Sequence, residues 1–115
     1  MQIDIQALNF TLTDGLHARV EHRLRLALTR FQDQIGGISV RLSDINGPKG
    51  GADKRCLMRS KANGLPDIVV VDIEADFYVA VDRAVGRARR TLERHRTRAG
   101  SPSNDPFQRG GDGDL

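Results

Sequence analysis

Five arginines recur along one segment near the C-terminal end of the sequence. They are Arg83, Arg87, Arg90, Arg94 and Arg98, separated by four, three, four and four residues. Residues three or four apart lie on the same face of an α-helix, so this spacing predicts a continuous ridge of guanidinium groups. Arginine binds phosphate through paired donors and stays charged at cellular pH. The ridge therefore indicates a polyanion site, and a phosphate backbone is the expected ligand.

Helix stability does not account for the ridge. Like charges at this spacing repel one another on an isolated helix. The plain alternative is a solvated helix face, with cations near its C-terminus because the helix macrodipole favours them there. About two or three basic residues would be enough to satisfy the macrodipole. Segment 76–99 instead holds seven arginines against three acidic residues, which favours the binding interpretation.

Two further segments are basic. They contain Arg19, Arg23, Arg25 and Arg30 in 13–32, and Lys49, Lys54, Arg55, Arg59 and Lys61 in 46–63. We do not expect all of them to share one face with the ridge. No Phe or Tyr lies in an expected strand, so RNA recognition by base stacking on a sheet is not expected. Recognition through shape and phosphates remains.

Catalytic arrangements are weak by comparison. The segment GPKGGADK at 47–54 lacks the residue order and the strand-to-helix context of a P-loop. His17 and His22 are five residues apart, so they do not form an i, i+4 metal pair, and Cys56 is expected to be an inert thiol that faces inward. No nucleophile, general base or cofactor site can be named. We therefore expect a protein that is not an enzyme and that binds no cofactor or metal.

Strands and helices that position these residues follow from periodicity. Alternating apolar and polar residues predict strands near 2–7, 38–43, 55–62 and 67–75, of which the last is the most apolar. Apolar residues at helical spacing predict two helices. The first follows a cap at Thr13 or Asp14 and ends near Gln34, and the second follows Asp76 and ends near Arg98.

The resulting order is β-α-β-β-β-α. The last three strands are joined by short turn-forming segments and should pair antiparallel, whereas the first two are joined through a helix and are able to lie parallel. Both helices need the same apolar sheet face. The expected fold class is therefore α+β, a two-layer sandwich of a four-stranded sheet with two helices on one face. The order of the strands within the sheet does not follow from the sequence.

Length and composition set the domain organisation. The chain has 115 residues, which allows one domain, placed at residues 1–99. Residues 100–115 are rich in Gly, Pro, Ser and Asp and are expected to form a disordered acidic tail. Apolar runs are too short for a membrane span, and the N-terminal segment lacks a secretory signal, which predicts a cytoplasmic protein. The single cysteine excludes an intramolecular disulfide.

Two helix segments carry a family resemblance. LTDGLHARVEHRLRLALTRF at 12–31 and ADFYVAVDRAVGRARRTLERHR at 75–96 resemble the ribosome hibernation promoting factors, also called ribosome-associated inhibitors. The resemblance covers residues 1 to about 98. It implies a domain similar to double-stranded RNA-binding domains, which binds small-subunit rRNA in the channel used by mRNA and tRNA and blocks translation in stress or stationary phase. Longer relatives carry a second domain that pairs ribosomes, and segment 100–115 is too short to encode it.

The resemblance also implies site residues. The family's basic positions fall on Arg23, on Lys54 and on several arginines of the last helix, whereas Arg83 comes from the ridge alone. The candidate rRNA-binding residues are Arg23, Lys54, Arg83, Arg87, Arg90, Arg94 and Arg96. The sequence departs from the family at Glu93, where Lys is common, at His17, which replaces a basic residue, and at Arg19, where an aromatic residue is frequent.

Two other classes of function stay open at this stage. One is a protein-interaction module that modulates transcription, as in sigma-factor modulation, and the other is a general double-stranded RNA-binding protein. A partner retained after RNA digestion would indicate the first, and equal affinity for any RNA duplex would indicate the second. The expected partners are the small ribosomal subunit and the whole ribosome, with no small-molecule substrate and no membrane. Off the ribosome the chain is expected to be a monomer.

Overall fold

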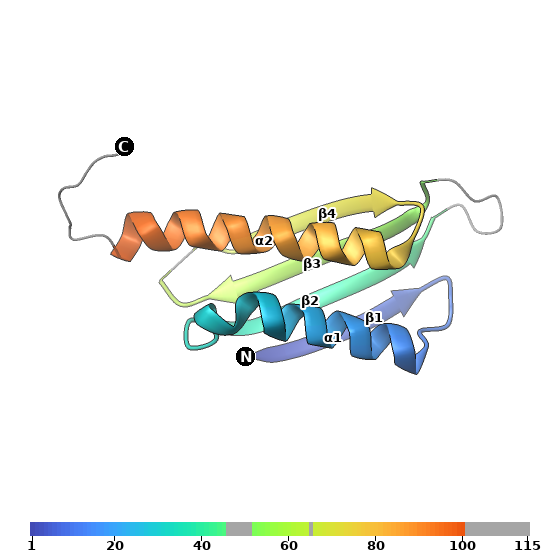
Figure 1. Ribbon diagram of the computed structural model, residues 1–115, viewed down its shortest axis with the longest axis horizontal. Coiled ribbons are helices and arrows are strands. Elements are labelled where there is room, and N and C mark those ends of the chain that lie inside the picture. Colours follow the sequence, from blue (N-terminus) through green and yellow to red (C-terminus); the bar gives the residue numbers. More distant parts are fainter. Residues whose placement is uncertain (46–51, 65, 101–115) are drawn as a thin grey trace.

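The computed structural model describes residues 1–45, 52–64 and 66–100, with the backbone alone for residues 96–100. Its elements in chain order are β1 (Gln2–Leu8), α1 (Asp14–Leu28), the 3-10 helix η1 (Thr29–Phe31), β2 (Ile35–Asp44), β3 (Lys54–Ala62), β4 (Ile68–Glu74) and α2 (Phe77–Gly100) (Figure 1). The expected order β-α-β-β-β-α is confirmed. Residues 46–51 of the glycine-rich segment and the expected tail from residue 101 onward lie outside the described residues.

The four strands form one sheet in the order β1-β2-β3-β4. β1 and β2 are parallel, with Ile5 opposite Val40, because α1 carries the chain back between them. β2 and β3 are antiparallel, with Val40 opposite Met58, and β3 and β4 are antiparallel, with Met58 opposite Val70. The expected antiparallel pairing of the last three strands is thus confirmed, and the first two strands are parallel, which the sequence left open. The sheet order, which the sequence left open, leaves β1 and β4 as the two edges.

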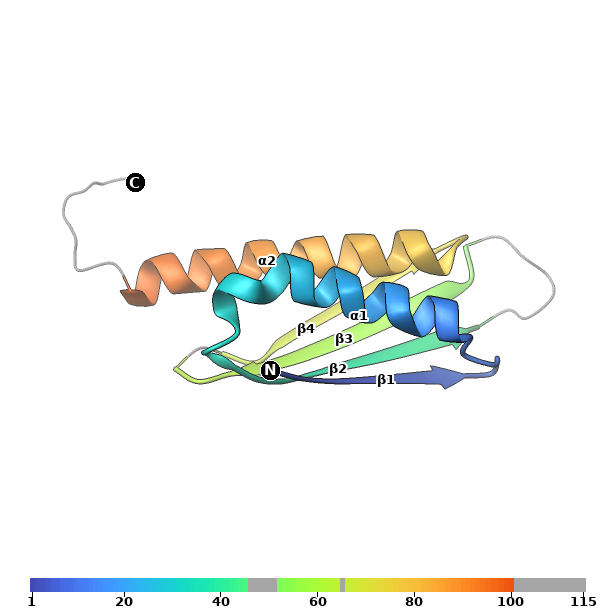
Figure 2. The ribbon, with the colours of Figure 1, turned by 60° about the horizontal axis from the view of Figure 1, so that its bottom comes forward.

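Both helices pack on one face of this sheet and leave the other face open (Figure 2). The core lies between the two layers and joins inward strand residues such as Leu42 and Met58 to helix residues such as Leu24 and Leu92. Phe31 is fully buried, and Phe10 and Phe77 stack on each other at the margin of the core with their ring centroids 4.5 Å apart. The expected α+β two-layer sandwich is confirmed.

Both helices begin at the polar residues that the sequence marks. Thr13 caps α1, where its Oγ1 accepts a hydrogen bond from the Leu16 amide at 3.1 Å. Asp76 precedes α2, and its carboxylate accepts one from the Tyr78 amide at 2.7 Å. These bonds satisfy amides that have no partner within the helix. α1 ends earlier than expected, at Leu28, because the chain tightens into η1 and thereby turns Phe31 into the core.

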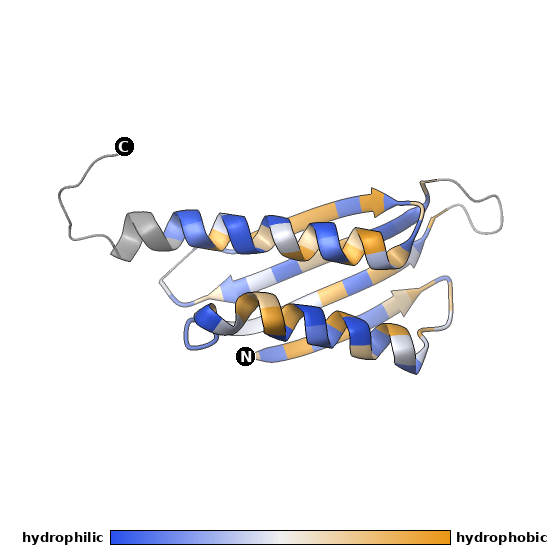
Figure 3. Cartoon of the chain, in the orientation of Figure 1, coloured by the Kyte–Doolittle hydropathy of each residue, from blue (hydrophilic) through white to orange (hydrophobic). Residues whose placement is uncertain are grey.

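Hydropathy alternates along the strands, and β4 is largely apolar (Figure 3). A strand this apolar would suit the centre of a sheet, but β4 forms an edge. Its outward side chains Val69, Val71 and Ile73 are therefore exposed by 53%, 37% and 42%. The open face of the sheet thus has an aliphatic row along its β4 edge.

Candidate nucleic-acid interface

The arginine ridge lies on the side of α2 that borders β4. The opposite side of the helix buries its apolar stripe, which includes Val81, Val85 and Leu92, so the arginines between these positions point outward. Arg83, Arg87, Arg90 and Arg94 are all exposed. The structure describes only the backbone at Arg96 and Arg98, so the Arg96 side chain lies outside the described residues.

The first two arginines of the ridge are bound to the sheet edge. Arg83 Nε lies 3.4 Å from a Glu74 carboxylate oxygen. The Arg87 guanidinium lies 3.7 Å from an Asp72 carboxylate oxygen and donates a hydrogen bond of 2.8 Å to the backbone carbonyl of Val71. That carbonyl belongs to an edge strand, whose free backbone groups can otherwise pair with another chain. These two arginines therefore fasten α2 to β4, and Arg87 also covers part of the exposed edge.

Arg90 and Arg94 differ from this pair. Neither makes an ion pair with any residue that the structure describes. A guanidinium nitrogen of Arg90 lies 3.4 Å from the position that a Cβ on Gly86 would occupy, so the absence of a side chain at Gly86 leaves Arg90 room to lie along the helix. Arg90 and Arg94 are thus the described ridge cations that are available to an external anion.

Acidic residues between the helices pair with other arginines. Asp82 lies 2.9 Å from Arg23 Nε and 3.5 Å from an Arg19 nitrogen, which joins α1 to α2. Glu93 lies 2.9 Å from Arg30 and 3.5 Å from Arg89. The acidic residues nearest to the ridge in sequence therefore pair with arginines between the two helices and leave the ridge arginines without these partners. Arg23, a candidate site residue, acts in the free chain as a link between the two helices.

Lys54 is also held by carboxylates, at the start of β3. Its Nζ lies 3.1 Å from Asp44 and 3.2 Å from the fully buried Asp53, and 5.9 Å from the centroid of the Phe77 ring. The hydrogen bond to Asp44 raises the pKa of Lys54 above its ordinary value and outweighs the opposing effect of burial. The ammonium group is therefore firmly charged, and it joins the start of β3 to Asp44 at the end of β2. Its candidate role towards rRNA stays a prediction.

Four further cations occupy the open face of the sheet. They are Arg41, Arg55, Arg59 and Lys61. The register places Arg59 opposite Ser39 and Lys61 opposite Gly37, on the face that lies away from the helices. The expectation that the basic residues do not all share one face with the ridge is confirmed, since Arg55, Arg59 and Lys61 lie on the opposite face of the sheet from the helices. Sequence reasoning omitted Arg41 from the basic set, although its alternation with the inward-facing Val40 and Leu42 places it on this same face.

Cys56 faces the core from the inner face of the sheet. Burial, with a smaller effect of the nearby Asp72 charge, raises the pKa of the Cys56 thiol to about 12, so the thiol stays protonated. The inward-facing Cys56 agrees with the expectation of an inert cysteine. His17 and His22 are exposed. Within residues 1–45, 52–64 and 66–100 no group of three His, Cys, Asp or Glu side chains is placed to hold a metal ion, and no helix is long and apolar enough to cross a membrane.

Comparisons with known proteins place this geometry in context. The family model described as "Sigma 54 modulation protein / S30EA ribosomal protein" matches residues 3–99. Among solved structures, the chain is similar to the N-terminal domain of Protein Y from Thermus thermophilus, with 30% identity and a TM-score of 0.68 over 82% of this chain and 98% of that one. A ribosomal subunit interface protein from Coxiella burnetii has 21% identity and a TM-score of 0.69 over 84% and 99%, which shows a common fold. No curated protein matches the chain.

Proposed function

The chain belongs to the Sigma 54 modulation protein / S30EA ribosomal protein family, and from this premise we propose that it is a ribosome-associated inhibitor of translation. It binds rRNA of the small ribosomal subunit in the channel for mRNA and tRNA, and it acts by occupying that channel, without catalysis or a cofactor. Its partners are the small subunit and the whole ribosome in the cytoplasm, and its role belongs to stress or the stationary phase. Off the ribosome it is a monomer.

The observation that carries this proposal is the unpaired part of the α2 ridge. Arg90 and Arg94 are exposed, and they make no ion pair with the residues described. Each offers a planar fork of donors that matches a phosphate oxygen pair. They stand one helical turn apart, so they can contact neighbouring phosphates of one RNA segment. A binding site of this kind needs no reacting group, in keeping with a role that is purely steric.

Three further candidate arginines bind rRNA by exchanging a carboxylate of the free chain for a phosphate. Arg23, Arg83 and Arg87 are each paired with a carboxylate in the free chain. Exposed ion pairs contribute only about 0.2–1 kcal/mol each, so a phosphate can replace the carboxylate at small cost. The contribution of these residues to binding is nevertheless reduced by the pair that must be broken.

Co-sedimentation with small ribosomal subunits tests the proposal. The wild-type chain is compared with Arg90→Gln/Arg94→Gln (R90Q/R94Q) and with a matched control, R25Q/R30Q, which removes the same charge from arginines that are paired with Glu21 and Glu93. We expect stoichiometric binding of the wild type at physiological salt. R90Q/R94Q should lose about tenfold in affinity per arginine, because a hydrogen bond to a charged group contributes about 1.5–3 kcal/mol.

Two outcomes contradict the proposal. The first is absence of the wild-type chain from the subunit fraction, and the second is equal loss of binding by R90Q/R94Q and the control. A partner that the chain retains after complete RNA digestion would instead support the protein-interaction alternative.

A further inference from the structure

The open face of the sheet has a regular arrangement of cations. The strand register defines four rows across this face, and each row contains one basic residue: Lys61 beside Gly37, Arg59 beside Ser39, Arg41 beside Leu57, and Arg55 beside Ser43. Successive rows are about 6.6–7 Å apart, since they are two residues apart along a strand. The four cations therefore form a strip along β3 that steps across to β2 at Arg41.

The strip has almost no compensating charge. None of its four cations makes an ion pair with a residue in the described part of the chain. Asp4 on β1 is the one acidic residue among the described strand positions that face this side, and it accepts a hydrogen bond from Gln6 at 3.3 Å. Arg41 is diagonal to Arg55 and Arg59 across the two strands, and long cationic side chains at such positions repel one another. The strip is therefore not explained by the stability of the sheet.

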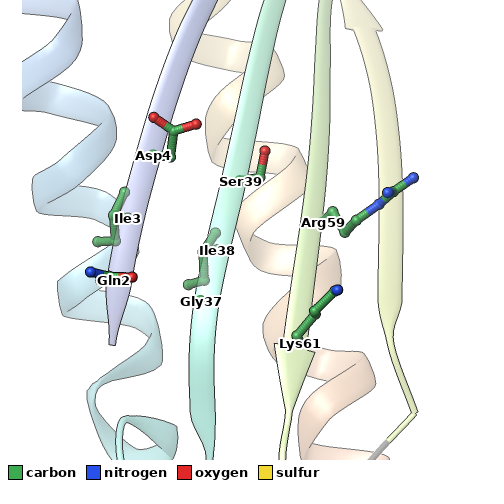
Figure 4. A pocket seen from close by; sticks show the side chains of 8 residues that line it. All are labelled: Gln2, Ile3, Asp4, Gly37, Ile38, Ser39, Arg59 and Lys61. Carbon is green, nitrogen blue, oxygen red and sulfur yellow. The ribbon is translucent and has the colours of Figure 1, made fainter.

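Two hollows adjoin the strip. A small one of about 80 Å³ lies between Arg41 and Arg59 and is lined by Ser39 and Leu57. A larger groove of about 460 Å³ shares Ser39 and Arg59 with it and runs over Gly37 towards β1, where Gln2 and Asp4 form the opposite side (Figure 4). The groove exists because the residues at its centre are small, namely Gly37 and Ser39. Together the hollows provide a compact space lined by Arg41, Arg59 and Ser39 and a wider space next to it. The Arg59 side chain extends towards β4 in the free chain (Figure 4).

We propose that this open face is a second RNA-binding surface, on which one phosphate lies between Arg41 and Arg59 and its nucleoside lies in the groove over Gly37. The Ser39 hydroxyl can donate a hydrogen bond to that phosphate, and the Asp4 carboxylate can accept one from the sugar or base. The inference rests on the proposed function, because a domain inside a channel lined by rRNA meets RNA on more than one side.

The chemistry of the strip favours a strand of RNA over other anions. A mononucleotide would use one phosphate seat, whereas the cations continue in the rows on either side, at Lys61 and Arg55. The aliphatic row on β4 lies directly beside the strip, with Val69 opposite Arg59 and Ile73 opposite Arg55, but none of its residues lines the groove. An acidic protein segment that used this row would lie over β4, whereas the groove on the other side of the strip is lined by the polar side chains of Gln2, Asp4 and Ser39. An RNA backbone that follows the strip can contact each row in turn.

Affinity measured across a range of salt concentrations tests this surface. Wild type, R41Q/R59Q and the control R25Q/R30Q are titrated with small ribosomal subunits and, in parallel, with a free single-stranded RNA oligonucleotide. Arg41 and Arg59 share one phosphate, so loss of that contact should lower the slope of log K against log salt by about 0.7–0.9. We expect at least a tenfold loss of affinity for R41Q/R59Q in both titrations, an unchanged slope for the control, and a melting temperature of R41Q/R59Q no lower than that of the wild type.

The parallel titrations separate this inference from the proposed function. If the wild type binds subunits and R41Q/R59Q binds them equally well with the same slope, the second surface is wrong and the proposed function stands. If the wild type binds the oligonucleotide through Arg41 and Arg59 but does not bind subunits, the proposed function is wrong and the surface stands. Displacement of the oligonucleotide by AMP at an equal concentration of nucleotide would overturn the assignment to an RNA strand.

Cross-linking distinguishes RNA from a protein partner. A Ser39→Cys variant carries a photoactivatable group on its new thiol, and the native Cys56 does not compete because it is buried and its pKa is raised. Irradiation of the complex with small subunits should yield a cross-link to rRNA. A cross-link to a ribosomal protein, or none at all, overturns the proposal.

Discussion

The α2 ridge and the open face of the sheet are both basic, yet their cations are in different states in the free chain. On the ridge, Arg83 and Arg87 are paired with Glu74 and Asp72. On the sheet, no ion pair restrains Arg41 or Arg59 among the described residues. A count of positive charges therefore overstates the number of unpaired cations on the ridge, whereas on the sheet it does not. What matters for an external anion is which cations are already neutralised.

The geometry of a helix on a strand explains where the ridge becomes free. Four residues of a helix advance about 6 Å and two residues of a strand advance about 6.6–7 Å, so every fourth residue of α2 lies beside every second residue of β4. Arg83 thus meets Glu74, and Arg87 meets Asp72, as α2 runs back along β4. The next inward positions of β4 are Val70 and Ile68, which have no charge to offer. Arg90 and Arg94 are left without a carboxylate for this reason.

The largest expected effect comes from removing the free cations of both surfaces together. In R90Q/R94Q/R41Q/R59Q, the loss of affinity for small subunits should equal the product of the losses in the two double variants, because mutations at distant sites without shared partners are additive. Equilibrium binding at one fixed salt concentration measures it. A combined loss no larger than that of either double variant would show that the two surfaces are not occupied at the same time.

R83Q/R87Q should lose less affinity for small subunits than the variants above, and it should also be less stable. These arginines fasten α2 to β4, and the Asp72 carboxylate that Arg87 faces is only 15% exposed. Their loss should therefore lower the free energy of unfolding by at least about 1 kcal/mol, because a largely buried carboxylate is left without its partner. Urea denaturation measures this change. R90Q/R94Q serves as the matched control and should stay within about 0.5 kcal/mol of the wild type. The distinction between paired and free arginines would be wrong if the two variants were equally stable, or if R83Q/R87Q lost more affinity for small subunits than R90Q/R94Q.

A gain of binding is expected when the partner of a ridge arginine is neutralised. Glu74→Gln releases Arg83, so the affinity for small subunits should rise about twofold to fivefold, the equivalent of one exposed ion pair. The same substitution combined with R83Q should show no gain. If Glu74→Gln alone leaves the affinity unchanged, pairing with β4 does not limit the ridge.

The smallest effect is expected on the open face, at Asp4. Asp4→Asn removes the single negative charge near the groove and keeps a group that accepts a hydrogen bond, so the affinity for a single-stranded oligonucleotide should rise by less than about twofold at physiological salt, where solvent-exposed charges are strongly screened. Glu21→Gln on α1 removes an equal charge from the helix layer and should leave the affinity unchanged. A loss of affinity in Asp4→Asn would mean that the carboxylate itself holds the RNA.

Much of the fold could be predicted from the sequence, because each element has its own local signal. Thr13 and Asp76 mark the helix starts through hydrogen bonds that extend only two or three residues along the chain. Alternation with the buried Met58 likewise predicts a basic outer face for β3. Signals of this kind depend on side chains within one turn of helix or a few strand residues, and tertiary contacts did not override them. The early end of α1 is the exception, since burying Phe31 required a tighter turn.

The sequence by itself determined the order of elements, the antiparallel pairing of the last three strands and the presence of an arginine ridge, since periodicity, short turns and capping act over short stretches of chain. Only the tertiary structure decided that β4 is an edge strand, that Arg83 and Arg87 are bound to it, and that Arg41 joins the β3 cations in one strip. These features depend on residues that are distant in sequence and meet through sheet order and register. Coulomb attraction and hydrogen bonding act over a few ångströms, so the state of each arginine follows from these neighbours.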